Sequence, residues 1–288
     1  MCGIIGRVNF SKDKINLDDL KKATNNLYHR GPDDYGIWEN KFCGFGHRRL
    51  SIIDLSKSAA QPMISSNNRY VCVFNGEIYN YVDLKKQLSC YGIKWKSSSD
   101  TEVLLEGWVI WKEKILTKID GMFAFVIWDK NEECLFVARD RVGEKPFYYS
   151  FDGNNFGFSS RPKQLFDLFP SLSKEYNNQS LRLYLESGYI PGALSIFKKI
   201  KKLEPGTFMK VNKNGLSIKK YWDLSLIKNK NNPKNFSESQ LIDQLDDILL
   251  KSVKDRMNSD VKLGAFLSGG IDSSLVVAMM TKLTKDPV

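Results

Sequence analysis

Short apolar segments separated by turn residues run through the first half of the chain. They predict strands over residues 2–9, 35–38, 42–45, 50–53, 70–75, 122–128, 134–139, 146–151 and 156–159. Between them, apolar residues recur about every 3.6 positions, which predicts helices over residues 17–27, 82–90 and 101–112. Asn16 is placed to cap the first helix, and Asp18 and Asp19 follow in the first turn, where the helix dipole favours negative charge. Strands on either side of helices predict two stacked sheets with helices outside.

A separate pattern begins near residue 237. Ser237 and Gln240 have the spacing of a capping box, and the apolar residues that follow predict an amphipathic helix. Residues 261–267 predict an apolar strand, and a further helix follows from Leu275 to Leu283. We therefore expect one domain over residues 1–210, a basic linker over residues 211–236, and the start of a second domain over residues 237–288.

Composition excludes several classes of protein. Apolar residues make up 42% of the chain, and no apolar run is long enough to span a bilayer, so we expect no membrane partner. The five cysteines have no paired spacing, which indicates a reducing cytoplasm and no structural disulfides. With only two histidines, a His-rich metal site is not expected, and we assign no residue as a metal ligand.

The net charge of +10 is concentrated in one segment. Residues 198–234 contain eleven lysines against Glu204 and Asp223, and no arginine. Base readout and strand stacking usually depend on arginine and aromatic side chains. We interpret the segment as a solvated surface and linker, and expect no nucleic-acid partner.

Cys2 is the first candidate for catalysis. A small second residue permits removal of Met1, after which Cys2 carries a thiol and an α-amine with ordinary pKa values of about 8.5 and 7.7–8.0. One residue then supplies both the nucleophile and its general base. An ordinary buried cysteine is the alternative reading of the same position.

Three further segments supply polar groups beside predicted strands. Arg49 can present a two-pronged guanidinium to a carboxylate, although taken alone a surface arginine is the favoured reading. Asn75 and Gly76 can place a side-chain amide and a backbone N–H together as an oxyanion hole, although Asn-Gly is also a turn signal. Asp100 fits either a helix cap or an anchor for an ammonium group, a role that Glu77 can share. Together these groups suit an amino acid with a side-chain amide.

Six segments of the chain resemble the glutamine-hydrolysing asparagine synthetase family. They are Met1-Cys2-Gly3-Ile4, Arg30-Gly31-Pro32-Asp33, Arg49-Leu50-Ser51-Ile52-Ile53-Asp54, Asn75-Gly76-Glu77-Ile78-Tyr79-Asn80, Gly121-Met122-Phe123-Ala124-Phe125 and Arg139-Asp140-Arg141-Val142-Gly143. The resemblance implies an α+β fold with a four-layer αββα N-terminal-nucleophile glutaminase domain. It also implies that Cys2 is the nucleophile, that Asn75 and Gly76 stabilise the oxyanion, and that glutamine is bound by Arg49, Leu50, Ser51, Ile52, Ile53, Asn75, Gly76, Glu77 and Asp100.

A glycine-rich loop opens the second domain. Glycines between a strand and a helix let backbone N–H groups approach a phosphate at the helix N-terminus, and the lysine of a Walker loop is absent. The loop resembles the pyrophosphate loop of ATP pyrophosphatases, which implies an α/β synthetase domain that uses ATP with Mg²⁺. The residues expected to bind ATP are Leu267, Ser268, Gly269, Gly270, Asp272, Ser273 and Ser274. The family's later segments would lie beyond Val288, so we expect this chain alone to act only as a glutaminase.

The resemblance leaves the acceptor of ammonia open. Aspartate is the expected acceptor and a homodimer is possible, but a sugar acid in surface-polysaccharide synthesis is an alternative. A non-catalytic remnant is a third reading, which the complete set of glutamine-binding residues opposes. One departure from the family is Arg161-Pro162, which reverses a charge near the expected domain interface.

Overall fold

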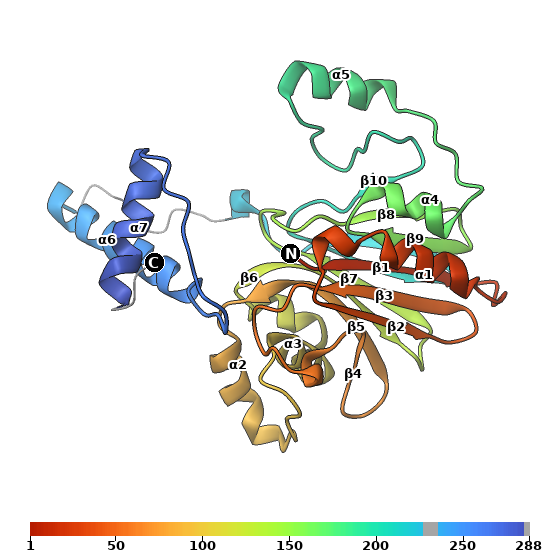
Figure 1. Ribbon diagram of the computed structural model, residues 1–288, viewed down its shortest axis with the longest axis horizontal. Helices are drawn as coiled ribbons and strands as arrows, with labels where there is room; N and C mark the ends of the chain where they lie inside the picture. Colours follow the sequence, from red (N-terminus) through yellow and green to blue (C-terminus); the bar gives the residue numbers. More distant parts are fainter. Residues whose placement is uncertain (227–235, 285–288) are drawn as a thin grey trace. The chain divides into compact units, whose positions relative to one another are not determined.

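Two antiparallel six-stranded sheets form the centre of residues Met1–Asp223 in the computed structural model, which describes residues 1–226 and 236–284 (Figure 1). The first sheet has the order β10-β8-β9-β1-β3-β2, with β1 (Gly3–Asn9), β2 (Asp34–Glu39), β3 (Cys43–Arg49), β8 (Tyr148–Phe151), β9 (Asn155–Ser159) and β10 (Lys201–Lys202). The second has the order β12-β11-β7-β6-β5-β4, with β4 (Met63–Ile64), β5 (Tyr70–Ile78), β6 (Gly121–Asp129), β7 (Cys134–Arg139), β11 (Thr207–Asn212) and β12 (Gly215–Lys220).

Alternation of side chains along the strands separates the apolar core into layers. In β1, Ile4 packs in the cluster between the two sheets, whereas its neighbour Ile5 packs against the helices on the outer face. In β6, Val126 faces the space between the sheets and Phe125 faces the opposite helical layer. Because successive strand residues point to opposite faces, both faces of each sheet are buried. This explains why these strands are apolar at nearly every position.

Helices cover the outer face of each sheet. The first sheet is covered by α1 (Leu17–Asn25) and α4 (Leu165–Leu168), and the second by α2 (Tyr81–Leu88) and α3 (Asp100–Trp111). Asn16 caps α1 as predicted, because its side chain accepts the N–H of Asp18 at 3.0 Å. Four layers result, with helices outside and sheets inside, and this confirms the predicted αββα arrangement.

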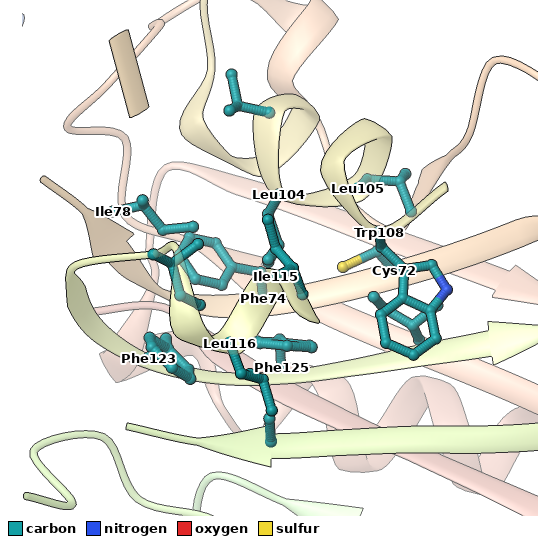
Figure 2. Close-up of a cluster of buried hydrophobic side chains, with 14 of the residues drawn as sticks. Cys72, Phe74, Ile78, Leu104, Leu105, Trp108, Ile115, Leu116, Phe123 and Phe125 are labelled. Carbon is teal, nitrogen blue, oxygen red and sulfur yellow. The ribbon is translucent and has the colours of Figure 1, made fainter. Parts of the chain in front are cut away.

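Figure 2 shows the contact between α3 and the second sheet. Leu104 and Leu105 on α3, with Trp108 one turn later, pack onto Phe74 of β5 and Phe125 of β6. These side chains are at most 7% exposed. Truncation of one such leucine to alanine typically costs about 2–5 kcal/mol. The start of α3 is therefore held firmly against β5.

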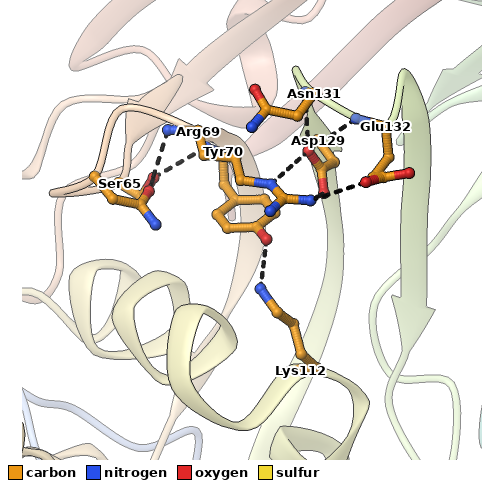
Figure 3. Close-up of polar contacts among 8 residues, drawn as sticks. Ser65, Arg69, Tyr70, Lys112, Asp129, Asn131 and Glu132 are labelled. Atoms are coloured by element: carbon orange, nitrogen blue, oxygen red, sulfur yellow. Dashed lines mark hydrogen bonds and ion pairs between the residues drawn. The ribbon is translucent and has the colours of Figure 1, made fainter.

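A polar cluster fixes the register of β5 against β6 (Figure 3). Arg69 donates two hydrogen bonds to the carboxylate of Asp129, from Nε at 2.8 Å and from Nη2 at 2.7 Å. The next residue, Tyr70, pairs with Asp129 in the ladder, and its hydroxyl accepts a hydrogen bond from Lys112. A slip of one residue would break this clamp and reverse the faces of every side chain in β5. The orientation of the polar residues later in β5 depends on this register.

The remaining helices complete the first unit. The helix α5 (Asn178–Ser187) begins after Asn177 and ends at Gly188, which has a φ of +75°. Short 3₁₀ helices are η1 (Tyr28–Arg30), η2 (Lys57–Ala59), η3 (Ser89–Tyr91), η4 (Lys112–Thr117) and η5 (Pro162–Gln164), and η6 (Leu224–Leu226) opens the second unit.

The second unit, Leu224–Val288, contains α6 (Glu238–Asp255) and α7 (Ile271–Leu283). The predicted capping box is present, because Ser237 N donates to Gln240 Oε1 at 2.9 Å and Gln240 N donates to Ser237 Oγ at 3.3 Å. The two helices contact one another, and Met279 and Met280 of α7 are buried.

Three predictions about the chain are wrong. Residues 50–53 form a loop, because the Arg49 side chain binds backbone carbonyls that follow it. Residues 261–267 form no strand in the described structure, since a strand needs neighbouring strands for its backbone hydrogen bonds, and Phe266 is fully exposed. Residues 211–220 of the expected linker belong instead to β11 and β12, which pair along the edge of the second sheet. Residues 227–235 of that linker lie outside the described residues.

Candidate active site

A pocket lies at the start of β1, where Cys2 meets the loop that follows β3. Its lining in the described structure is Met1, Cys2, Arg49, Leu50, Ile52, Ile53, Ala59, Gln61, Phe74, Asn75, Gly76, Glu77, Ser99, Asp100, Thr101, Met122 and Lys145. Eight of the nine residues expected around glutamine are in this lining. The ninth, Ser51, instead donates its backbone N–H to Asp33 Oδ2 at 2.8 Å. The fold thus brings residues from distant segments around the Cys2 sulfur.

Backbone groups hold Cys2 on two sides. Its Sγ accepts the N–H of Leu50 at 3.4 Å and donates to the Leu50 carbonyl oxygen at 3.6 Å. Its carbonyl oxygen accepts the Nε–H of Arg30 at 2.9 Å. Burial raises the pKa of the Cys2 thiol, although the Leu50 hydrogen bond and the nearby amino terminus oppose that rise. The sulfur therefore needs an adjacent base to become a thiolate at neutral pH.

The amino terminus supplies such a base. Burial lowers the pKa of the Met1 ammonium, and the positive charges of Arg30 and Lys145 lower it further. An amine with a lowered pKa is unprotonated more often at neutral pH and accepts a proton readily. If Met1 is removed, as we expect, its nitrogen leaves with it, and the α-amine of Cys2 becomes the new amino terminus.

Asn75 is a buried polar residue in the middle of β5, where it pairs with Ala124 of β6. Neither Nδ2 nor Oδ1 of its side chain has a hydrogen-bond partner among the described residues. A buried amide without partners costs about 1–3 kcal/mol, so an arrangement of this kind indicates a ligand-binding role. The alternative reading of Asn75-Gly76 as a turn is wrong, because the strand continues to Ile78.

The backbone N–H of Gly76 points toward the open edge of β5. On a strand, alternate N–H groups point to the same edge. Phe74 N, two residues earlier, donates to Gln61 Oε1 at 2.6 Å, and Ile78 N, two residues later, donates to Asp100 Oδ2 at 3.0 Å. The N–H of Gly76 lies between them on that edge, beside the pocket. A side chain at this position would meet Met122 O at 2.2 Å, so only glycine fits.

Arg49 is the last residue of β3. Its Nη1 donates to Ser56 O at 2.9 Å and its Nη2 donates to Ile53 O at 3.2 Å and to Asp54 O. These bonds fold residues 50–56 into the loop that walls the pocket. The Nε–H and one Nη1–H are left over from the five donors of the guanidinium, and because they lie on different sides of the group, each can donate a single hydrogen bond to a ligand.

Asp54 joins this loop to the segment before α3. Its Oδ1 accepts the N–H and the hydroxyl of Ser56, at 3.0 and 2.6 Å, and its Oδ2 accepts the N–H of Ser98 at 2.7 Å. Although burial opposes it, hydrogen bonds from Ser56 and Ser98 keep the pKa of Asp54 below its ordinary value. The charged carboxylate therefore ties the Arg49 loop to the residues next to Asp100.

Asp100 is the first residue of α3, and Ser99 is the cap, because Ser99 Oγ accepts the N–H of Thr101 at 3.1 Å. The expectation of Asp100 as a helix cap is therefore wrong. Burial raises the pKa of Asp100 to about 6. Glu77, on β5, lines the same pocket. Two carboxyl groups thus converge where an ammonium ion would offset the cost of burying their charge.

Sequence reasoning missed four polar residues of the lining, which are Gln61, Ser99, Thr101 and Lys145. Gln61 links two walls, since its Oε1 accepts Phe74 N and its Nε2 donates to Thr101 Oγ1 at 3.2 Å. Nothing in the sequence around Gln61 or Thr101 indicates this. Lys145 is 5% exposed. The one signal in the sequence that this lysine is buried is its position directly before Pro146 and an apolar strand.

The glycine-rich loop lies in the second unit, before α7. Gly269 has a φ of +81°, and Gly270 occupies the N-cap position, where no side chain of the described residues caps α7. Ser273 Oγ donates to Gly270 O at 3.1 Å and lies 3.0 Å from Ser268 Oγ. The first backbone N–H groups of α7 are therefore available to an anion, and the loop fits a phosphate group. The other residues expected to bind ATP, Leu267, Asp272 and Ser274, flank this cradle.

Two other features are absent from residues 1–226 and 236–284. No group of three or more His, Cys, Asp or Glu side chains in that part is arranged to hold a metal ion. Likewise, none of the helices described there has the length and apolar character required to cross a bilayer.

Comparisons with known proteins cover both units. Residues 1–222 match the family model described as glutamine amidotransferase domain, and residues 244–288 match the one described as asparagine synthase. Among curated proteins, the chain is 36% identical over 283 residues to glutamine-hydrolyzing asparagine synthetase 1 of Bacillus subtilis (strain 168), a match that covers 97% of this chain and 44% of that protein. It is 34% identical over 284 residues to asparagine synthetase 3 of the same organism, covering 97% and 45%. The chain spans less than half the length of these two relatives.

A solved structure with a similar fold is glutamine phosphoribosylpyrophosphate amidotransferase from Bacillus subtilis. It matches with a TM-score of 0.58 and 17% identity, over 98% of this chain and 64% of that chain. This likeness supports the two-sheet fold, with the helices on its outer faces.

Proposed function

The chain belongs to the glutamine amidotransferase family, and we propose that it hydrolyses the side-chain amide of glutamine at Cys2 to glutamate and ammonia. In the complete protein, the ammonia would be transferred to the side-chain carboxylate of aspartate after activation by ATP, which gives asparagine. The relatives named as glutamine-hydrolyzing asparagine synthetases support this acceptor. The five free thiols of the described structure fit the expected cytoplasmic location.

The first half of the reaction forms a thioester. With Met1 removed, the α-amine of Cys2 takes the proton from Sγ, and the thiolate attacks the amide carbon of glutamine. Negative charge moves to the carbonyl oxygen, where the Asn75 amide and the Gly76 N–H donate hydrogen bonds. The protonated amine then gives its proton to the leaving nitrogen. Ammonia departs, and the γ-glutamyl group remains on Sγ.

The second half hydrolyses that thioester. The α-amine takes a proton from water, and the resulting hydroxide attacks the same carbonyl carbon. The same two donors stabilise the second oxyanion, and collapse breaks the carbon–sulfur bond. Glutamate is released, and the proton returns to Sγ. Throughout, Arg49 would hold the α-carboxylate of glutamine, and Glu77 with Asp100 would hold its α-ammonium group.

One observation carries this proposal: the Asn75 amide is buried beside Cys2 and has no hydrogen-bond partner in the part of the chain that the structure describes. A structural asparagine would satisfy its amide within the fold. An oxyanion donor needs the opposite arrangement, with the amide fixed in place before the charge develops.

The second unit would contribute to ATP binding. Backbone N–H groups of Gly269, Gly270 and the first turn of α7 would hold phosphate oxygens, and Ser268 and Ser273 would add hydroxyl donors. When bound, ATP with Mg²⁺ would supply the activation of the acceptor carboxylate. The loop's exposed position in this chain leaves water free to reach it, since Leu267 is 62% exposed and Ile271 is 87% exposed.

Ammonia release from glutamine without ATP tests the proposal. We expect the wild-type chain to release ammonia and glutamate in equal amounts, and Cys2→Ala to release neither while melting like the wild type. Added ATP and aspartate should yield no pyrophosphate from this chain. Ammonia release that survives in Cys2→Ala would refute the proposed reaction.

A further inference from the structure

A rigid loop presents Lys145 to the pocket. Asp140, which is 1% exposed, accepts the backbone N–H groups of Val142, Glu144 and Lys145 at 3.2, 2.9 and 3.0 Å. Arg139 donates to the Lys145 carbonyl at 2.7 Å from Nε, and to two further backbone carbonyls from its Nη atoms. Two charged side chains thus determine the course of the loop from β7 to β8, and Lys145 occupies one position on the pocket wall.

The ammonium group of Lys145 is a buried charge without a partner of its own. Lys145 is 5% exposed, and no described residue forms a hydrogen bond or an ion pair with its Nζ. Burial lowers the pKa of Lys145, and the negative charges of Glu144 and Glu77 oppose this. A largely buried ammonium without a hydrogen-bond partner is costly, and its place in the pocket wall lets it act on a charge that arises there.

Counting the charges of the pocket shows which anions Lys145 faces. Under the proposed function, Arg49 takes the substrate carboxylate, and Glu77 with Asp100 takes the substrate ammonium. Two carboxylates against one ammonium leave one negative charge over, and the thiolate of Cys2 adds a second when it forms; both act on Lys145, Glu77 more strongly than Cys2. Cys2 and Lys145 line the same pocket and lie within electrostatic reach of one another.

We propose that the Lys145 ammonium is a positioning charge for the nucleophile, one that favours the deprotonated form of the Cys2 thiol and α-amine pair. This inference rests on the proposed function for its catalytic consequence. A positive charge lowers the pKa values of both groups in a coupled pair, so the pair as a whole carries fewer protons at a given pH. The nucleophile and its base are then both ready at neutral pH.

Other charges also act on this pair, and their signs determine what a variant should show. Arg49 of β3 and Asp100 of α3 act on the Cys2 thiol. Arg30 of η1 and Asp33, in the loop before β2, act on the amino terminus of Met1, next to Cys2. Glu77 of β5 and Glu144 act on Lys145 itself. Arg30 and Arg49 remain when Lys145 is changed. We therefore expect the pH midpoint of the thiol and α-amine pair to shift only in part, and the pair still to titrate.

Alkylation of Cys2 by iodoacetamide measures this effect without glutamine turnover. The rate at Cys2 is read by peptide mass spectrometry from pH 5.5 to 10 in the full chain without Met1. In Lys145→Met, the midpoint of the profile should rise by about 0.5–1 pH unit, which lowers the rate at pH 7 roughly three- to tenfold. Lys145→Arg, which keeps the charge, should follow the wild type. Lys114→Met, which removes an exposed charge on η4, is the matched control and should also follow it.

The outcomes separate the inference from the proposed function. If Lys145→Met does not fold, Lys145→Gln replaces it in the same assay. A wild-type profile in the neutral variant would overturn the inference, as would an equal shift in Lys145→Arg, which would point to shape in place of charge. A shifted profile in a chain that releases no ammonia from glutamine would refute the proposed function and leave the role of Lys145 standing.

Discussion

The Nε2 atom of His47 lies 3.2 Å from the carbonyl oxygen of Phe74, and this contact joins the two sheets one residue before Asn75. His47 belongs to β3 and Phe74 to β5, so the bond crosses the apolar layer between the sheets. Because a carbonyl only accepts, the His47 ring must carry its proton on Nε2. Burial lowers the pKa of His47 to about 4, so the ring is neutral at pH 7.

His47 should make the first unit less stable in acid. Its folded-state pKa of about 4 is below its ordinary value of 6.5, so the unfolded chain binds the proton first as the pH falls. The associated stability is present above pH 6.5 and is lost between pH 6.5 and 4, by about 3 kcal/mol. His47→Gln keeps a donor for Phe74 and removes the titration. Urea unfolding from pH 7.5 to 4.5 should show that the free energy of unfolding falls less in this variant than in the wild type. If the two plots of this free energy against pH are parallel, the assignment is wrong.

Asp100 should have the opposite pH dependence. Its folded-state pKa of about 6 is above its ordinary value of 3.8, so its contribution to stability falls as the pH rises from 3.8 through 6. Asp100→Asn removes the buried charge and should raise the free energy of unfolding at pH 7.5 by about 1–3 kcal/mol. The same change should raise the KM for glutamine, because the ammonium loses a counter-charge. A variant that is both less stable and unchanged in KM would exclude Asp100 from the substrate site.

Replacement of Asn75 should likewise lower activity and raise stability. Asn75→Leu replaces an amide that has no hydrogen-bond partner within the described residues by an apolar group of similar shape. We expect kcat to fall about 10²- to 10³-fold, the usual effect of losing one oxyanion donor. The free energy of unfolding should rise by about 1–3 kcal/mol. A loss of activity accompanied by a loss of stability would show that the amide has a structural role instead.

Much of the fold was predictable from local pattern. Asn16 caps α1, Ser237 and Gln240 form their capping box, and the bounds of β7 coincide with the predicted residues 134–139. These features depend on neighbouring residues in the chain. By contrast, residues 50–53 look like a strand but form a loop, because Arg49 binds carbonyls of the next few residues and Asp54 binds Ser98, far along the chain.

The place of the candidate site residues was predictable where a motif identifies them, as with Cys2 and Asn75, which line one pocket; their catalytic roles stay predictions. It was not predictable where position depends on packing between distant segments. Gln61 enters the pocket because Phe74 N and Thr101 Oγ1 lie on either side of it. In contrast, α5 was missed although local signals were present, since Asn177 and Gly188 bound it; its apolar residues are exposed, with Leu185 at 75%.

Arg49 binds carbonyl oxygens of the loop that follows it and, under the proposed function, also binds the substrate carboxylate. A lysine cannot replace it in both roles. A lysine ammonium lacks the planar fork, so it cannot bind the carbonyls of the loop and a carboxylate together. Arg49→Lys should therefore lower kcat/KM for glutamine roughly ten- to a hundredfold, mainly through KM. Arg48→Lys is the matched control, because Arg48 donates to Gly31 O at 3.0 Å and is not in the pocket lining of the described structure. Equal kinetics in the two variants would mean that the pocket does not bind glutamine in this way.

Covalent capture of Cys2 by a glutamine analogue tests the central claim most directly. A diazoketone in place of the side-chain amide reacts only with a nucleophile positioned at that carbon. Intact and peptide mass spectrometry should show one adduct per chain, on Cys2, with Met1 absent, and excess glutamine should slow its formation. Cys2→Ala should give no adduct. Three results would contradict the proposed mechanism: an adduct on another cysteine, adduct formation that excess glutamine does not slow, or an active chain that retains Met1.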